Sequence, residues 1–90
     1  MAKKRERLEV IFDILNAIRE SNNNIKPTRL LYSSNLSPQM FRDYINELVN
    51  KGFIAETENK GRKIYSLTDK GFKFLEKYII MIEFIENFGL

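Results

Sequence analysis

Apolar residues recur at helical spacing in the first half of the chain and predict three helices. Residues 5–20 carry two apolar stripes with the period of an α-helix, so this helix is expected to be buried on more than one side. Pro27 suits the first turn of a second, short helix that ends near Asn35, because the N–H that proline lacks has no helical partner there. Ser37 then caps a third helix, which stops at Gly52.

The connection between the second and third predicted helices is very short. It comprises residues 35–37, which leaves no room for a long excursion and sets the two helices at a steep angle. This arrangement is typical of a helix-turn-helix.

The second half of the chain predicts a hairpin followed by one long helix. Residues 53–58 and 63–67 alternate as strands do, and the polar residues 59–62 between them form a turn. Thr68 caps a last helix that runs to about Phe88. The predicted fold is therefore mainly α with a small β-hairpin, in the order helix, helix, helix, strand, strand, helix.

The exposed face of the third predicted helix carries side chains that suit the edges of bases. A step of 100° per residue places five polar residues opposite or beside the apolar positions: Gln39, Arg42, Asp43, Asn46 and Asn50. Gln and Asn can pair with adenine, Arg with guanine, and Asp can accept from cytosine. Because any exposed helix face is polar, this helix taken alone favours an ordinary solvated surface.

Basic groups on both sides of this helix change the balance toward a polyanion partner. Free N–H groups and cations at the start of the second helix can hold a phosphate, and the tip of the predicted hairpin is also basic. The chain has a formal net charge of +3. Together these features predict binding to double-stranded DNA, with the third helix in the major groove and the hairpin on the backbone. The expected DNA contacts are Lys26, Thr28, Arg29, Ser37, Gln39, Arg42, Asn46, Lys60, Arg62 and Lys63.

Residues 51–54 and, after the turn, residues 65–71 resemble the strand-wing-strand-helix signature of winged-helix regulators, and the match spans almost the whole chain. The order of elements, the basic start at residues 1–5 and the long apolar last helix are similar to small archaeal winged-helix DNA-binding proteins of chromatin-protein or transcriptional-regulator type. In that group the last helix pairs as an antiparallel coiled coil between two subunits. The resemblance implies residues 37–46 as the recognition segment and residues 60–63 as the wing.

The last predicted helix is apolar almost all round, which is an independent argument for a homodimer. The stripe expected to cover its own domain consists of Phe72, Leu75, Ile79 and Ile82. A second stripe, at strict 4,3,4,3 spacing, would expose five large side chains in a monomer and needs a partner. This expected dimer interface consists of Phe74, Tyr78, Met81, Ile85 and Phe88. A tail that folds back within one subunit is the alternative.

The length and composition limit the remaining possibilities. At 90 residues the chain is expected to form a single domain, with residues 1–67 as the DNA-binding part and residues 68–90 as the dimerisation helix. The absence of histidine and cysteine removes the usual metal ligands and nucleophiles, so no enzyme activity, metal or cofactor is expected. The longest apolar run, residues 78–82, is far shorter than the roughly 20 residues of a membrane span. A cytoplasmic, nucleoid-associated protein is expected.

Three questions stay open at the level of the sequence. A winged-helix module that binds protein and not DNA is the competing interpretation, since fold alone does not determine function. Within DNA binding, a sequence-specific regulator and an architectural protein are not separated. The spacing of half-sites and the existence of a small-molecule effector are also undetermined.

Overall fold

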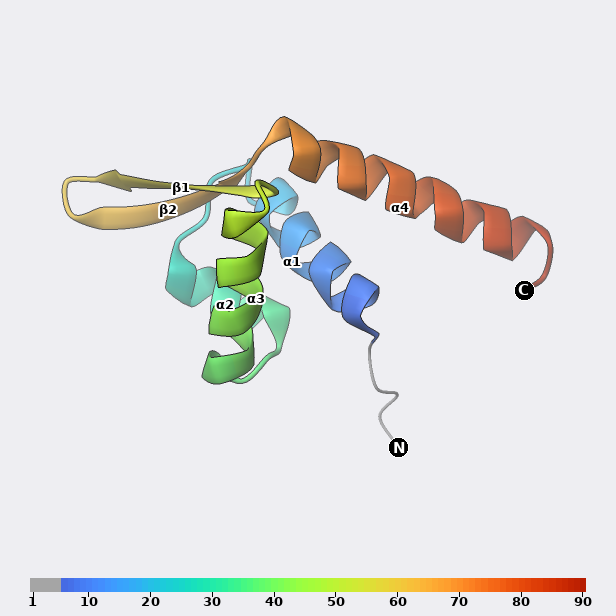
Figure 1. Cartoon of the computed structure of the whole chain (residues 1–90), viewed down its shortest axis with the longest axis horizontal. Coiled ribbons are helices and arrows are strands. Elements are labelled where there is room, and N and C mark those ends of the chain that lie inside the picture. The colour runs from blue at the N-terminus through green and yellow to red at the C-terminus, as the bar shows by residue number, and fades with distance from the viewer. Residues whose placement is uncertain (1–5) are drawn as a thin grey trace.

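The computed structural model describes residues 6–90 and has the predicted elements in the predicted order (Figure 1). The elements are α1 (Arg7–Glu20), α2 (Pro27–Ser34), α3 (Pro38–Asn50), β1 (Ile54–Asn59), β2 (Arg62–Leu67) and α4 (Asp69–Asn87). The expected basic start at residues 1–5 lies outside the described residues. The mainly α fold with one antiparallel hairpin is confirmed.

Helix α1 is the centre of the hydrophobic core. Ile14, Leu15 and Ile18 are completely buried, and Val10 and Ile11 on the adjacent face are nearly so. Because both apolar stripes are covered, the prediction that this helix is buried on more than one side is confirmed. Leu8 belongs to the same apolar pattern but is 51% exposed in the first turn of the helix.

The residues that begin and end the helices act as their chemistry predicts. Asn35 ends α2 in the left-handed conformation, with φ at 57°, which asparagine tolerates better than most residues. The Ser37 side chain accepts a hydrogen bond from the backbone N–H of Met40 at 3.2 Å, and Thr68 accepts one from Gly71 at 3.2 Å. These caps determine where α3 and α4 begin.

The hairpin turn contains two residues and not the expected four. Lys60 and Gly61 both have positive φ, at 53° and 77°, which is the geometry of a type I′ turn. Asn59 therefore pairs directly with Arg62, and each strand is longer at the turn than predicted. The turn matches the right-handed twist of the strands, so the hairpin projects as a regular ribbon.

A short backbone pairing ties the loop after α1 to the hairpin. The N–H of Ile25 donates to the carbonyl of Tyr65 at 3.1 Å, and the N–H of Tyr65 donates back to Ile25 at 2.9 Å. Asn23 adds a side-chain contact, since its Oδ1 accepts from the N–H of Leu67 at 2.6 Å. The loop thereby fixes the start of α2 relative to the hairpin.

Helix α4 leaves the hairpin through a close backbone contact. A Cβ on Gly71 would lie 2.4 Å from the carbonyl oxygen of Phe53, so only glycine fits there without a shift. Phe74 then packs edge-on against Phe53, with ring centroids 5.8 Å apart, and Tyr78 stacks on Phe12 of α1 at 4.6 Å. Beyond these contacts the helix extends away from the rest of the molecule (Figure 1).

Candidate nucleic-acid interface

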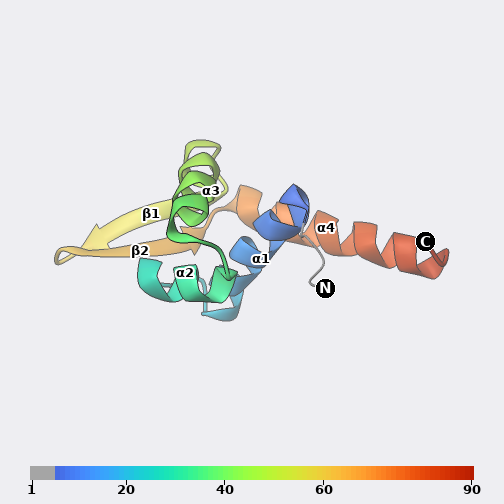
Figure 2. The same ribbon diagram turned by 90° about the horizontal axis from the view of Figure 1, so that it is seen from below.

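The elements expected to contact DNA lie together at one end of the molecule. Figures 1 and 2 show α2, α3 and the hairpin at this end, whereas the C-terminal half of α4 projects from the opposite end. All ten residues predicted to contact DNA are exposed. The fold therefore brings three segments that are separate in the sequence onto one accessible side.

The exposed face of α3 carries an internal hydrogen bond. The Gln39 amide nitrogen donates to Oδ1 of Asp43 at 3.1 Å, one helical turn away. Arg42 and Asn46 are exposed on the same helix. These polar positions were predicted from the sequence, but the pairing of Gln39 with Asp43 was not. Their i,i+4 spacing could have indicated it.

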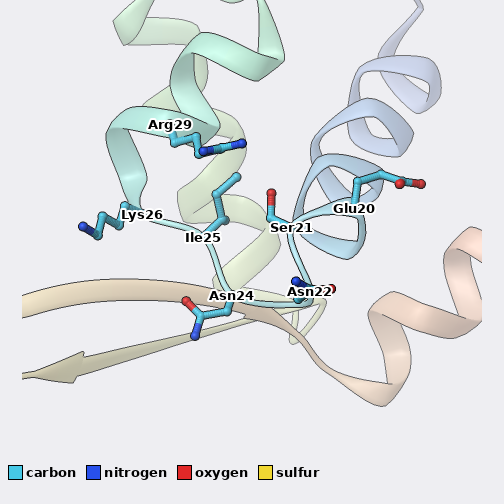
Figure 3. A pocket seen from close by; sticks show the side chains of 7 residues that line it. All are labelled: Glu20, Ser21, Asn22, Asn24, Ile25, Lys26 and Arg29. Carbon is cyan, nitrogen blue, oxygen red and sulfur yellow. The ribbon is translucent and has the colours of Figure 1, made fainter.

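A polar pocket of about 460 Å³ lies beside the start of α2 (Figure 3). Arg29 extends into it toward Ser21, whereas Lys26 extends outward. Asn22 and Asn24 add amide groups from the loop, and sequence reasoning did not include them in the site. The first turn of α2 has no side-chain cap, so its free N–H groups add to the positive character of this region.

The hairpin presents its cations on two different faces. Neighbouring strand residues point to opposite sides, so Arg62 and Lys63 face away from each other. The Lys63 ammonium pairs with Oε1 of Glu56 across the hairpin at 3.3 Å, and this carboxylate raises the pKa of the lysine. Lys63 is thus partly neutralised within the chain, whereas Lys60 and Arg62 lie at the tip.

An ionic cluster holds α3 against the start of α1. The Glu47 carboxylate accepts from the Arg7 guanidinium and from the Lys51 ammonium, the latter at 2.7 Å. These hydrogen bonds lower the pKa of Glu47 to about 2. Arg7 also lies over the Tyr44 ring, 5.9 Å from its centroid. The cluster fixes the position of α3 from the side opposite its exposed face.

The apolar surface of α4 is divided differently from the two predicted stripes. Phe74, expected at a partner, packs against the chain's own core, and Tyr78, also expected there, stacks on Phe12 of α1. Phe72, expected on the inner stripe, is 41% exposed. Gly71 of α4 lies against the Phe53 carbonyl, and the helical periodicity of the sequence does not indicate that contact. The large apolar side chains exposed toward the C-terminal end are Ile80, Met81, Phe84, Phe88 and Leu90.

A groove lies between α1 and α4. Its volume is about 310 Å³, and the stacked rings of Phe12 and Tyr78 contribute to its lining. Glu9, Asp13 and Glu83 also line it. The pKa of Tyr78 is raised by burial and by the nearby charges of Glu9 and Asp13. The groove is thus acidic, unlike the end of the molecule that carries α2 and the hairpin tip.

Residues 6–90 contain no group of three or more histidine, cysteine, aspartate or glutamate side chains that could hold a metal ion. Within the same residues, no helix has the length and apolar character needed to cross a membrane.

The sequence as a whole matches the family model described as winged helix-turn-helix over residues 4–86. The chain belongs to the winged helix-turn-helix family. In this family's terms α2 and α3 form the helix-turn-helix, and the hairpin is the wing. The identification confirms the resemblance seen in the sequence and the predicted fold.

Two proteins of the archaeon Methanocaldococcus jannaschii are related to this winged helix-turn-helix chain. MJ0290 is 39% identical over 74 residues, which cover 82% of this chain, and MJ0287 is 42% identical over 69 residues, which cover 70%. The matched segments represent 32% of MJ0290 and 69% of MJ0287, so this chain spans about a third of the first relative.

A solved structure with the same architecture is Sso10a-2, described as a DNA-binding protein from Sulfolobus solfataricus. It is 28% identical, with a TM-score of 0.76, and the alignment covers 93% of this chain and 85% of that one. The winged helix-turn-helix chain therefore has the fold of an archaeal DNA-binding protein over nearly its full length. Regulators with this fold are normally non-enzymatic.

Proposed function

We propose that this protein binds double-stranded DNA as a homodimer, with α3 in the major groove and the hairpin on the backbone. One observation carries the proposal: the polar face of α3, the cationic start of α2 and the basic hairpin tip lie at the same end of a winged helix-turn-helix. Phosphate contacts position a protein on the duplex, and base contacts specify the sequence. This end of the molecule offers groups for both tasks.

The proposed contacts divide into two kinds. Those that hold phosphates are the cations and free N–H groups of α2 and the hairpin: Lys26, Thr28, Arg29, Lys60, Arg62 and Lys63. Those that face the bases lie at the N-terminal part of α3, the part that reads base edges in helix-turn-helix proteins: Ser37, Gln39, Arg42 and Asn46. Because Lys63 already pairs with Glu56, we expect it to contribute less than Arg62.

The proposed dimer forms through α4. A monomer would expose Phe84 and Phe88 to 60% and 67%, side by side with ring centroids 4.9 Å apart, and a second copy of the helix would cover them. Antiparallel pairing of two α4 helices places the two DNA-binding parts at opposite ends. In this proposal residues 1–67 bind DNA and residues 68–90 dimerise, packed as one domain. It places the protein at the nucleoid and includes no catalysis or cofactor.

The test is the affinity for a random-sequence duplex across a salt series. Each neutralised phosphate adds about 0.9 to the slope of log affinity against log salt. We expect a steep slope, reduced by about 1.8 in Arg62→Ala, because the proposed dimer loses one phosphate contact in each subunit, and by less in Lys63→Ala. Lys77→Ala on α4 is the matched control, because it removes the same charge outside the proposed surface. Equal effects of Arg62→Ala and Lys77→Ala would refute the assignment of the hairpin.

A protein-binding module is the second candidate, favoured by two exposed apolar side chains near the turn between α2 and α3. Tyr32 is 80% exposed and Met40 is 48% exposed. Aromatic and methionine side chains are enriched in protein interfaces. Absence of duplex binding at low salt would favour this candidate over the first.

A further inference from the structure

The hydrogen bond between Gln39 and Asp43 restricts what Gln39 can present to a ligand. A carboxylate only accepts hydrogen bonds, so the amide nitrogen of Gln39 faces Asp43, and its carbonyl oxygen lies at the other end of the amide. The nitrogen has two hydrogens, and Asp43 takes one of them. Gln39 keeps one N–H donor and one carbonyl acceptor, both on an exposed side chain at the N-terminal part of α3.

We propose that Asp43 is a positioning residue that orients Gln39 to read an adenine in the major groove. This inference rests on the proposed DNA-binding function. Adenine presents the acceptor N7 beside the N6 amino donor, which matches one N–H and one carbonyl. Guanine presents two acceptors, thymine one acceptor and a methyl group, and cytosine only a donor. An oriented Gln39 therefore makes both of its hydrogen bonds only with adenine.

The negative charge of Asp43 weakens DNA binding, whereas its hydrogen bond to Gln39 favours binding to adenine. A carboxylate on the helix that enters the groove repels nearby phosphates and lowers the affinity for every sequence alike. An asparagine at this position keeps an oxygen that accepts from Gln39 but loses the charge, whereas an alanine loses both. Asp43→Asn and Asp43→Ala thus separate the hydrogen bond from the charge.

The experiment begins with selection of bound duplexes by the wild-type protein from a randomised pool. Affinities of the wild type and both variants are then measured on the selected duplex and on duplexes with guanine or 7-deazaadenine in place of the preferred adenine. Because 7-deazaadenine lacks only the N7 acceptor, it tests the N–H of Gln39 directly. A random-sequence duplex is measured in parallel, and thermal unfolding confirms that each variant is folded.

We expect the wild type to lose about tenfold in affinity on the guanine duplex, the size of one bidentate base contact, and less on the 7-deazaadenine duplex, which removes only one of the two hydrogen bonds. Asp43→Asn should keep most of this preference, and Asp43→Ala should reduce it below about threefold, as should Gln39→Ala. Both Asp43 variants should bind the random duplex more tightly than the wild type. This division between preference and affinity is not expected of a residue with a merely structural role.

Two results would overturn the inference while leaving DNA binding intact. One is a selected pool without any adenine preference, and the other is an Asp43→Ala protein with the same preference as the wild type. If the wild type fails to bind the random duplex at low salt, the proposed function and this inference both fall.

Discussion

Replacing Lys60 with asparagine should stabilise the fold and weaken DNA binding at the same time. Lys60 is the first residue of the two-residue turn and has φ at 53°, a left-handed conformation. For residues other than glycine this conformation costs roughly 1–2 kcal/mol, and asparagine tolerates it better because its short side chain can hydrogen-bond locally. Asn-Gly is also the preferred sequence of a type I′ turn, and Gly61 is already in place.

The expected gain in stability is the part of this conformational free energy that asparagine avoids and lysine does not. We take a gain of about 0.5–1 kcal/mol in the free energy of unfolding, which raises the Tm of a domain of this size by about 2–8 °C. Thermal unfolding should be compared at equal protein concentration, because the proposed dimerisation would make Tm concentration-dependent. On a random duplex, the loss of one phosphate contact in each subunit of the proposed dimer should reduce the salt slope by about 1.8.

The two readouts test different parts of the reasoning. Lys77→Asn on α4 removes the same charge without touching the hairpin, so it should leave the salt slope unchanged. A Lys60→Asn protein that is less stable than the wild type would show that the turn does not have its present geometry in solution. A more stable variant with an unchanged salt slope would show that Lys60 does not contact phosphate.

The other predictions concern the contacts that hold the fold and the dimer together. Gly71→Ala should lower the free energy of unfolding by about 1–3 kcal/mol in urea titrations, because its methyl group meets the Phe53 carbonyl; equal stability would contradict this close contact. The folded-state pKa of Glu47 lies below its ordinary value of 4.5, so the unfolded chain binds more protons and stability is lost as pH falls from about 4.5 toward 2. Glu47→Gln should flatten that part of the pH dependence, measured as the urea midpoint, and an unchanged profile would argue against the ionic cluster. Phe84→Glu should give a folded monomer by sedimentation equilibrium while Lys77→Glu stays dimeric; a Phe84→Glu dimer would place the interface elsewhere.

Local chemistry was enough to predict most of the fold. Pro27 can begin a helix but not continue one from the preceding turn, and Ser37 and Thr68 have side chains that satisfy the first free N–H groups. These signals act within three or four residues of the chain, so the sequence alone contains them. The order of elements and the short turn between α2 and α3 followed directly.

The features that could not be predicted depend on contacts between distant residues. The pairing of Ile25 with Tyr65 joins positions 40 residues apart, and no local pattern indicates it. The register places Glu58 directly opposite Lys63, yet Lys63 pairs with Glu56, and no local pattern indicates which of the two carboxylates it contacts. The sequence was therefore enough to predict which helices and strands carry the candidate site. Which of its charged side chains pair with each other could be seen only in the structure.

The rotation of α4 has a consequence for how two copies bind DNA. If the dimer interface ran from Phe74 to Phe88, a symmetric antiparallel pair of α4 helices would be centred near Met81. Phe74 packs on Phe53 and Tyr78 stacks on Phe12 within the same chain, so we take the proposed dimer interface to run from Ile80 to Phe88, and its centre moves about three residues toward the C-terminus. At 1.5 Å per residue each DNA-binding part lies about 4.5 Å farther from the two-fold axis, and the two lie about 9 Å farther apart. With roughly 3.4 Å per base pair and the paired helices parallel to the duplex axis, the proposed dimer should favour half-sites two to three base pairs farther apart than an interface from Phe74 to Phe88 would give.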